Sequence, residues 1–138
     1  MSDACAMPDK TVMVNWLDAQ RDRIGRGELL GEDTLTGVDL DALLDRRDAA
    51  AFDTAWNAAF AAIEARWYTE KIPRSVDKAI DRLRKAAFKA VSRATAEHGI
   101  AAYVSDDFEL IARARALEFD DAFVAELWKT YKKGGIPS

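Results

Sequence analysis

The sequence predicts an all-α fold, a single-domain helical bundle of about five helices over residues 1–138. Alanine is abundant while there are only 7 glycines and 3 prolines, a composition that favours helices. The share of hydrophobic residues is 49% and of charged residues 32%, which is typical of a folded protein. Apolar residues also recur at three- and four-residue spacing in several segments. No repeat or long linker divides the chain, so we expect one domain.

The N-terminal third is expected to hold one long and one short helix. Apolar residues at helical spacing predict a helix over residues 9–24, although the run 12–16 also fits a short strand. Residues 1–8 are expected to be flexible, and a cluster of glycines predicts a loop over residues 25–38. Asp39 is expected to begin a short helix, whose apolar side is formed by Leu40, Leu43 and Leu44.

The C-terminal two-thirds are expected to form two antiparallel helical hairpins. Residues 48–68 carry a continuous face of aromatic and small residues, and Pro73 suits the start of the next helix. The connection is short, which predicts that this helix pairs with the helix over residues 73–98. His98 and Gly99 are expected to close that helix, with the glycine as a left-handed cap.

The second hairpin is expected to follow an apolar link over residues 100–104. Ser105 is a good N-cap, and Asp106 and Asp107 would then stand in the first turn, where negative charge is favourable. Asp120 or Asp121 is expected to begin the last helix.

The most informative feature is a row of basic side chains, the basic ridge, on the helix over residues 73–98. At about 100° per residue its apolar residues gather on one side and its bases on the other. The apolar side consists of Val76, Ile80, Leu83, Ala87, Ala90, Val91 and Ala94. The basic ridge consists of Lys71, Arg74, Lys78, Arg82, Lys85, Lys89 and Arg93. This pattern predicts a helix that buries one face and presents a positive surface, which is either a solvated face or a binding site.

The ridge is an exception in an acidic chain. The net charge is −4, with 14 acids and seven bases in residues 1–70 but two acids and eight bases in residues 71–93. The acids of residues 28–53 form a candidate acidic patch that includes Asp41, Asp45 and Asp48. Such segregated charge indicates contact with a charged partner.

No catalytic, cofactor or metal site is predicted. The single histidine, His98, is explained by a helix end, and Cys5 has no activating neighbour. The carboxylates lack the spacing of a calcium loop, and the glycines lack the lysine of a phosphate-binding loop. Aromatic residues fall on apolar helix faces and are expected in the core. The chain is therefore expected not to be an enzyme.

We expect a non-enzymatic helical module that binds another protein. The candidate contact residues are Lys78, Arg82, Lys85, Lys89, Asp41, Asp45 and Asp48. At the level of class, the chain resembles small acidic regulatory proteins and toxin-neutralising immunity proteins, whose acidic patches cover basic toxin surfaces. No motif identifies one family, and the resemblance implies only that the acidic patch meets a basic partner.

The alternative function is a nucleic-acid accessory protein that uses the basic ridge, because lysine and arginine side chains neutralise phosphates. It is the weaker hypothesis, since no recognition motif accompanies the ridge and the rest of the chain is acidic. The sequence has neither a signal peptide nor an apolar run long enough for a membrane, so a cytoplasmic protein without cofactor is expected. It leaves the oligomeric state open.

Overall fold

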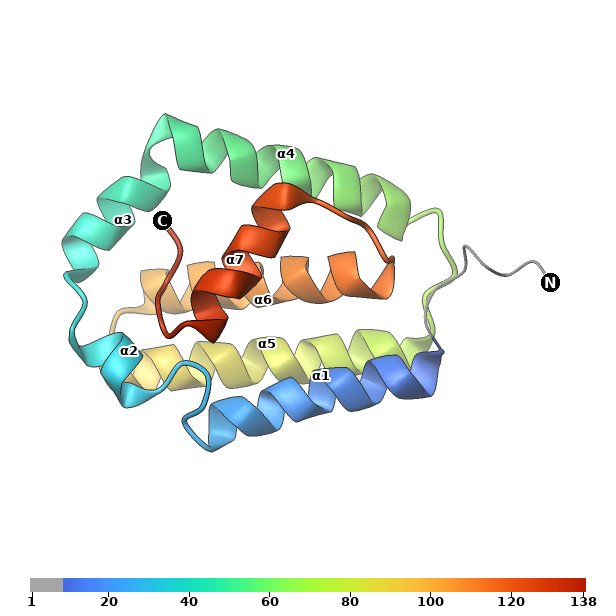
Figure 1. Cartoon of the computed structure of the whole chain (residues 1–138), viewed down its shortest axis with the longest axis horizontal. Helices are drawn as coiled ribbons and strands as arrows, with labels where there is room; N and C mark the ends of the chain where they lie inside the picture. The colour runs from blue at the N-terminus through green and yellow to red at the C-terminus, as the bar shows by residue number, and fades with distance from the viewer. Residues whose placement is uncertain (1–8) are drawn as a thin grey trace.

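The computed structural model describes residues 9–138, and these residues fold into seven helices (Figure 1). In chain order they are α1 (Lys10–Gly25), α2 (Glu32–Thr36), α3 (Leu40–Asp48), α4 (Ala50–Trp67), α5 (Arg74–Thr95), α6 (His98–Ala116) and α7 (Ala122–Lys132). The prediction of an all-α bundle is confirmed for this range, whereas the expected number of about five helices is too low. The predicted flexibility of residues 1–8 lies outside the described residues.

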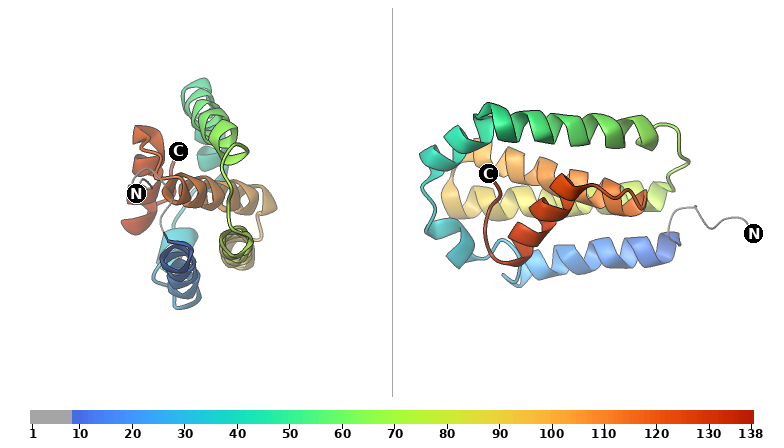
Figure 2. Two further views of the ribbon diagram at one scale, coloured as in Figure 1. Left: turned by 90° about the vertical axis from the view of Figure 1, so that its right-hand side faces the viewer. Right: turned by 45° about the horizontal axis from the view of Figure 1, so that its top comes forward.

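Helix α5 packs against α1 and α6 and leaves its outer side exposed, while α6 is the most buried helix of the bundle (Figures 1 and 2). Its predicted apolar side is confirmed, because its buried residues are Val76, Ala79, Ile80, Leu83, Ala87 and Val91. The basic ridge lies on the opposite side, and every one of its seven side chains belongs to an exposed residue. The helical phase read from the sequence is therefore correct for most of the helix, but at its C-terminal end Ala90 is only half-buried and Ala94 is exposed.

The partner predicted for α5 is wrong. Helix α4 packs against α3, α6 and α7, while α5 pairs with α6 across a connection of two residues, Ala96 and Glu97. Ala96 adopts the left-handed conformation (φ 56°), so the chain turns there and not at Gly99 as expected. Glu97 then caps α6 by accepting a hydrogen bond from the Gly99 backbone N–H. His98 and Gly99 consequently belong to the first turn of α6.

Helix α6 also replaces the predicted link over residues 100–104. It is continuous because Ile100, Val104, Phe108 and Ile111 form one buried face at helical spacing. Ser105 is not an N-cap but lies inside the helix, where its hydroxyl donates to the backbone carbonyl of Arg84. Asp106 and Asp107 were predicted to stand in the first turn of a helix, but they lie in the middle of α6.

The N-terminal segment differs less from expectation. Asp9 caps α1 by accepting hydrogen bonds from the Thr11 and Val12 backbone, and residues 12–16 are helical, so the strand alternative is wrong. The predicted loop over residues 25–38 contains the short helix α2, whose Leu35 is buried. Helix α2 packs against α5, which closes one end of the bundle.

Helices α3, α4 and α7 cover the other side of α6. Asp39 caps α3 and Asp121 caps α7, as predicted, each accepting a hydrogen bond from a backbone N–H three residues later. Helix α7 contacts α6 but crosses it obliquely (Figure 1), so the two helices do not form the antiparallel hairpin that was expected. The edge-to-face pair of Trp16 and Trp128, with ring centroids 5.6 Å apart, joins α7 to α1.

Candidate functional site

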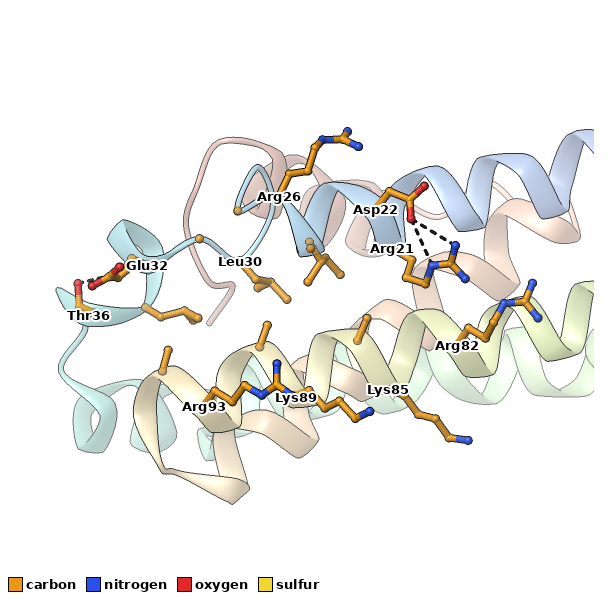
Figure 3. Close-up of a pocket in the computed structure, with 18 residues that line it drawn as sticks. Arg21, Asp22, Arg26, Leu30, Glu32, Thr36, Arg82, Lys85, Lys89 and Arg93 are labelled. Atoms are coloured by element: carbon orange, nitrogen blue, oxygen red, sulfur yellow. Dashed lines mark hydrogen bonds and ion pairs between the residues drawn. The ribbon is translucent and has the colours of Figure 1, made fainter.

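A large concave surface lies between α1, the segment 25–31, α2 and the outer side of α5, and we call it the basic groove (Figure 3). Its volume is about 1230 Å³. Six bases line it, namely Arg21, Arg26, Arg82, Lys85, Lys89 and Arg93. Only two acids do so, Asp22 and Glu32. A concave surface with this charge is the best candidate site in a chain whose net charge is −4.

The ridge supplies one rim of the basic groove. Arg82, Lys85 and Lys89 line it, as predicted for a binding surface, whereas the fourth candidate base, Lys78, lies outside it. Arg82 donates to the Asp18 carboxylate of α1 at 3.1 Å, and Lys85 pairs with Asp81 at 3.0 Å. These exposed pairs are weak and leave the side chains able to change partner.

Lys89 and Arg93 are the bases of this rim that have no partner. Within residues 9–138, no carboxylate lies within 4.0 Å of either side chain. Figure 3 shows both on the same stretch of α5, opposite α2 and the segment 25–31. This end of the basic groove therefore carries uncompensated positive charge.

The opposite wall depends on an unusual backbone turn after α1. Gly27 has φ +76°, and the Glu28 and Leu29 backbone N–H groups donate to the Arg23 carbonyl. A Cβ on Gly31 would lie 2.5 Å from the Gly27 carbonyl oxygen, so only glycine fits there. Leu30 adopts the left-handed conformation (φ 53°), which costs about 1–2 kcal/mol for a residue with a Cβ. Its side chain is nevertheless buried beside the basic groove.

The floor of the basic groove is apolar. It consists of Ile24, Leu35, Ala86, Ala90 and Ala94. Ala90 and Ala94 were assigned to the buried side of α5, yet Ala90 is only half-buried and Ala94 is exposed. Small side chains thus leave an open surface between the bases and the wall formed by α2. Such a combination of apolar floor and charged rim is typical of a protein-binding groove.

The predicted acidic candidates lie elsewhere. Asp41, Asp45 and Asp48 belong to α3, and none of them lines the basic groove. Asp48 accepts a hydrogen bond of 2.6 Å from the Tyr103 hydroxyl, which raises the pKa of that tyrosine. Asp41 and Asp45 are exposed. The structure therefore separates the two groups of candidate residues into two surfaces.

A buried polar cluster, the Arg47 network, lies behind α3. Arg47 donates two hydrogen bonds of 2.8 Å to the Asp107 carboxylate, and this residue pair is almost fully buried. The Trp56 indole N–H and the Tyr131 hydroxyl also donate to Asp107. Arg47 reaches one further acceptor, the Pro137 carbonyl at 3.0 Å. All of these groups are satisfied by one another, so the cluster is structural.

Burial and the neighbouring Asp107 charge raise the pKa of Tyr131 well above its usual value. Burial alone would lower the pKa of Arg47, but its hydrogen bonds and charge interaction with Asp107 outweigh burial and raise it. The Asp107 carboxylate therefore holds both a guanidinium and a protonated phenol. No local sequence pattern predicted this cluster, because Asp107 was assigned to the first turn of a helix.

The described residues contain no group of three or more histidine, cysteine or acidic side chains placed to hold a metal ion. The His98 ring lies 2.8 Å from the Ser92 hydroxyl through Nδ1 and stacks on Phe88. Cys5 lies outside the described residues. Within residues 9–138, no helix combines the length and hydropathy needed to cross a bilayer.

Comparison with protein-family models gives a match over most of the chain. A family model described as Immunity protein PIM1 matches residues 21–138. The matched range contains the whole of the basic groove and every member of the Arg47 network. No curated protein matches the chain.

Proposed function

The chain belongs to the Immunity protein PIM1 family, and from this premise we propose that it binds one toxin protein and neutralises it. The proposal includes that the protein acts by binding alone, without catalysis, and that it works in the cytoplasm. The observation that carries it is the family match over residues 21–138, which spans the helical body from the second half of α1 onward.

The basic groove supports a protein as partner. It offers both exposed charge and an apolar floor, and binding sites for proteins combine an apolar centre with a polar rim. Complementary charge speeds the encounter of two proteins and selects the correct partner. The Arg47 network supports a rigid body behind this surface, because its buried groups hold α3, α4, α6 and α7 together.

A nucleic-acid accessory role is the second sequence prediction, and it has less support. None of the residues that line the basic groove is aromatic, so it offers no platform on which bases would stack. The net charge of −4 also opposes approach to a polyanion.

The test is a growth experiment with an identified partner. The full chain, carrying an affinity tag, is used to capture proteins from the source organism after nuclease treatment, and each captured protein is then expressed alone and with this chain. We expect one captured protein to arrest growth alone, to be harmless with this chain, and to form a stoichiometric complex with it. If no captured protein arrests growth, or if co-expression gives no protection, the proposed function is wrong.

A further inference from the structure

The partner surface can be specified by its chemistry, on the premise of the proposed function. We propose that the basic groove binds an acidic amphipathic helical segment of the toxin, with its carboxylates against the bases of α5 and its apolar face on the groove floor. This inference reverses the charge expected from the class resemblance, in which an acidic patch on this chain met a basic toxin.

Charge is the first argument. Six bases and two acids line the basic groove, so it is positive although the chain is negative. Lys89 and Arg93 have no carboxylate within 4.0 Å among residues 9–138. Arg82 and Lys85 are held only by exposed pairs, which a ligand carboxylate can replace at little cost. An acidic segment is complementary to all four.

Shape is the second argument. The volume of about 1230 Å³ exceeds the range of about 300–1,000 Å³ usual for small-molecule pockets. About three turns of a helix that is about 10 Å across would occupy a comparable volume. Between the wall formed by Leu30 and the bases of α5, the floor presents Ala86 and Ala90, which let a helix approach closely. Apolar residues at helical spacing on the segment would meet this floor.

The strained backbone of Leu30 supports the same assignment. A left-handed leucine persists only where surrounding structure holds it, and such residues gather at binding sites. Here the turn through Gly27 and Gly31 places the Leu30 side chain against the groove. The wall is thus formed before any partner binds.

The first experiment uses the toxin recovered in the growth assay. Lys89→Glu combined with Arg93→Glu reverses the unpaired charges, and we expect affinity to fall by at least about tenfold. The matched control is Asp41→Lys combined with Asp45→Lys, two reversals of exposed charge on α3 that we expect to change affinity less than about twofold. If the control lowers affinity and the α5 variant does not, the groove assignment is wrong while the proposed function stands.

An uncharged variant separates contact from long-range electrostatics. Ala90→Trp fills the floor of the basic groove without changing its charge, and we expect it to weaken toxin binding by at least about tenfold. Circular dichroism and the urea midpoint verify that each variant is folded. Wild-type affinity in a folded Ala90→Trp variant would contradict docking on this floor.

A second experiment does not depend on finding a toxin. Amide resonances of the full chain are followed by NMR during titration with a synthetic helical peptide of about twelve residues, with leucines on one face and glutamates on the other. We expect shifts confined to residues 21–36 and 82–94 at peptide concentrations up to about 1 mM. A peptide with lysines in place of the glutamates is the matched control and is expected to give no shifts there.

This titration tests the assignment of the basic groove independently of the proposed function. Absent shifts with the acidic peptide, or shifts elsewhere on the molecule, overturn the inference even if the growth assay succeeds. Single-stranded oligothymidine is tested in parallel as a phosphate probe. If it shifts the same residues at lower concentration than the acidic peptide, the groove is a nucleic-acid site and the proposal for a protein segment is wrong.

Discussion

The protein uses charge in two contrasting ways, in the Arg47 network and in the basic groove. In the network one guanidinium and one carboxylate are buried, and each finds its hydrogen-bond partners inside the protein. In the groove, bases lie exposed around an apolar floor, and two of them lack a carboxylate partner within residues 9–138. Charge that is buried and paired specifies the fold, whereas exposed charge without a partner is available for binding.

Breaking the buried pair should give the largest effect on stability. Arg47→Ala leaves the Asp107 carboxylate buried without its cation, and we expect a loss of about 3–5 kcal/mol of unfolding free energy. Urea unfolding followed by circular dichroism measures it. The double variant Arg47→Met with Asp107→Leu is expected to recover only part of the loss, because it removes both charges but leaves the Trp56 and Tyr131 donors without their acceptor. A loss below about 1 kcal/mol for Arg47→Ala would contradict a structural role for the pair.

A backbone change in the groove wall should have a smaller effect. Gly31→Ala brings a Cβ to 2.5 Å from the Gly27 carbonyl oxygen, so the turn must shift. We expect about 1–3 kcal/mol of destabilisation, as for other overpacked sites, together with weaker partner binding. Gly25→Ala is the matched control, because a Cβ at Gly25 meets no atom within 4 Å. Equal losses of unfolding free energy for the two variants would show that the close contact between Gly31 and Gly27 does not restrict this position to glycine.

The pH dependence of the network gives an effect of about 1 kcal/mol. Tyr131→Phe removes one hydrogen bond to Asp107, and we expect to lose about 1 kcal/mol near pH 7. Because the pKa of Tyr131 is raised in the folded state, its proton stabilises the fold fully below the unfolded value of about 10, and this contribution is lost as pH rises above it.

Wild-type stability should therefore fall above pH ~10 more steeply than that of the Phe variant. Unfolding curves between neutral pH and pH ~11 compare the two proteins. Parallel slopes above pH ~10 would mean that the Tyr131 pKa is the same in both states.

Removing a base from the groove should have the smallest effect on stability. Lys85→Ala deletes an exposed pair with Asp81, and we expect a change within about 0.5 kcal/mol. The same thermal and urea measurements that detect Arg47→Ala serve here. If Lys85→Ala lowered the unfolding free energy as much as Arg47→Ala, the bases of the groove would be needed for the fold. The groove and the Arg47 network would then not differ in their contribution to stability.

Local sequence patterns correctly predicted the helices in which charged and apolar residues lie on opposite faces. Helix α5 was assigned correctly because its bases and apolar residues segregate, and Asp9, Asp39 and Asp121 cap helices at or beside the predicted starts. Helix α6 was misread because Asp107 is an acid on a buried face. Its burial depends on Arg47, which lies 60 residues away in the sequence, and no local pattern reports such a partner.

Only part of the candidate site was predicted, because the rest depends on contacts between segments that are distant in the sequence. The α5 bases were visible as a ridge, but their concave setting depends on how the end of α1 and α2 pack against α5. The glycines predicted a loop, yet not that Leu30 would turn into the left-handed region and form a wall. Arg21 and Arg26 therefore escaped notice as groove residues. Contacts between segments distant in sequence decide both points.

The large sequence separation between Arg47 and its acceptors also determines the order in which contacts can form during synthesis. Its acceptors lie 60 and 90 residues further along the chain, at Asp107 and Pro137, whereas the residues that line the basic groove are complete by Ala94. A ribosome delivers the groove segments several seconds before it delivers α7, at about 5–20 residues per second. Arg47 therefore lacks its carboxylate partner until Asp107 of α6 has been added, and it gains the Pro137 carbonyl only at the end of synthesis. The buried pair that joins α3 to α6 can thus form only after the segments of the basic groove are already present.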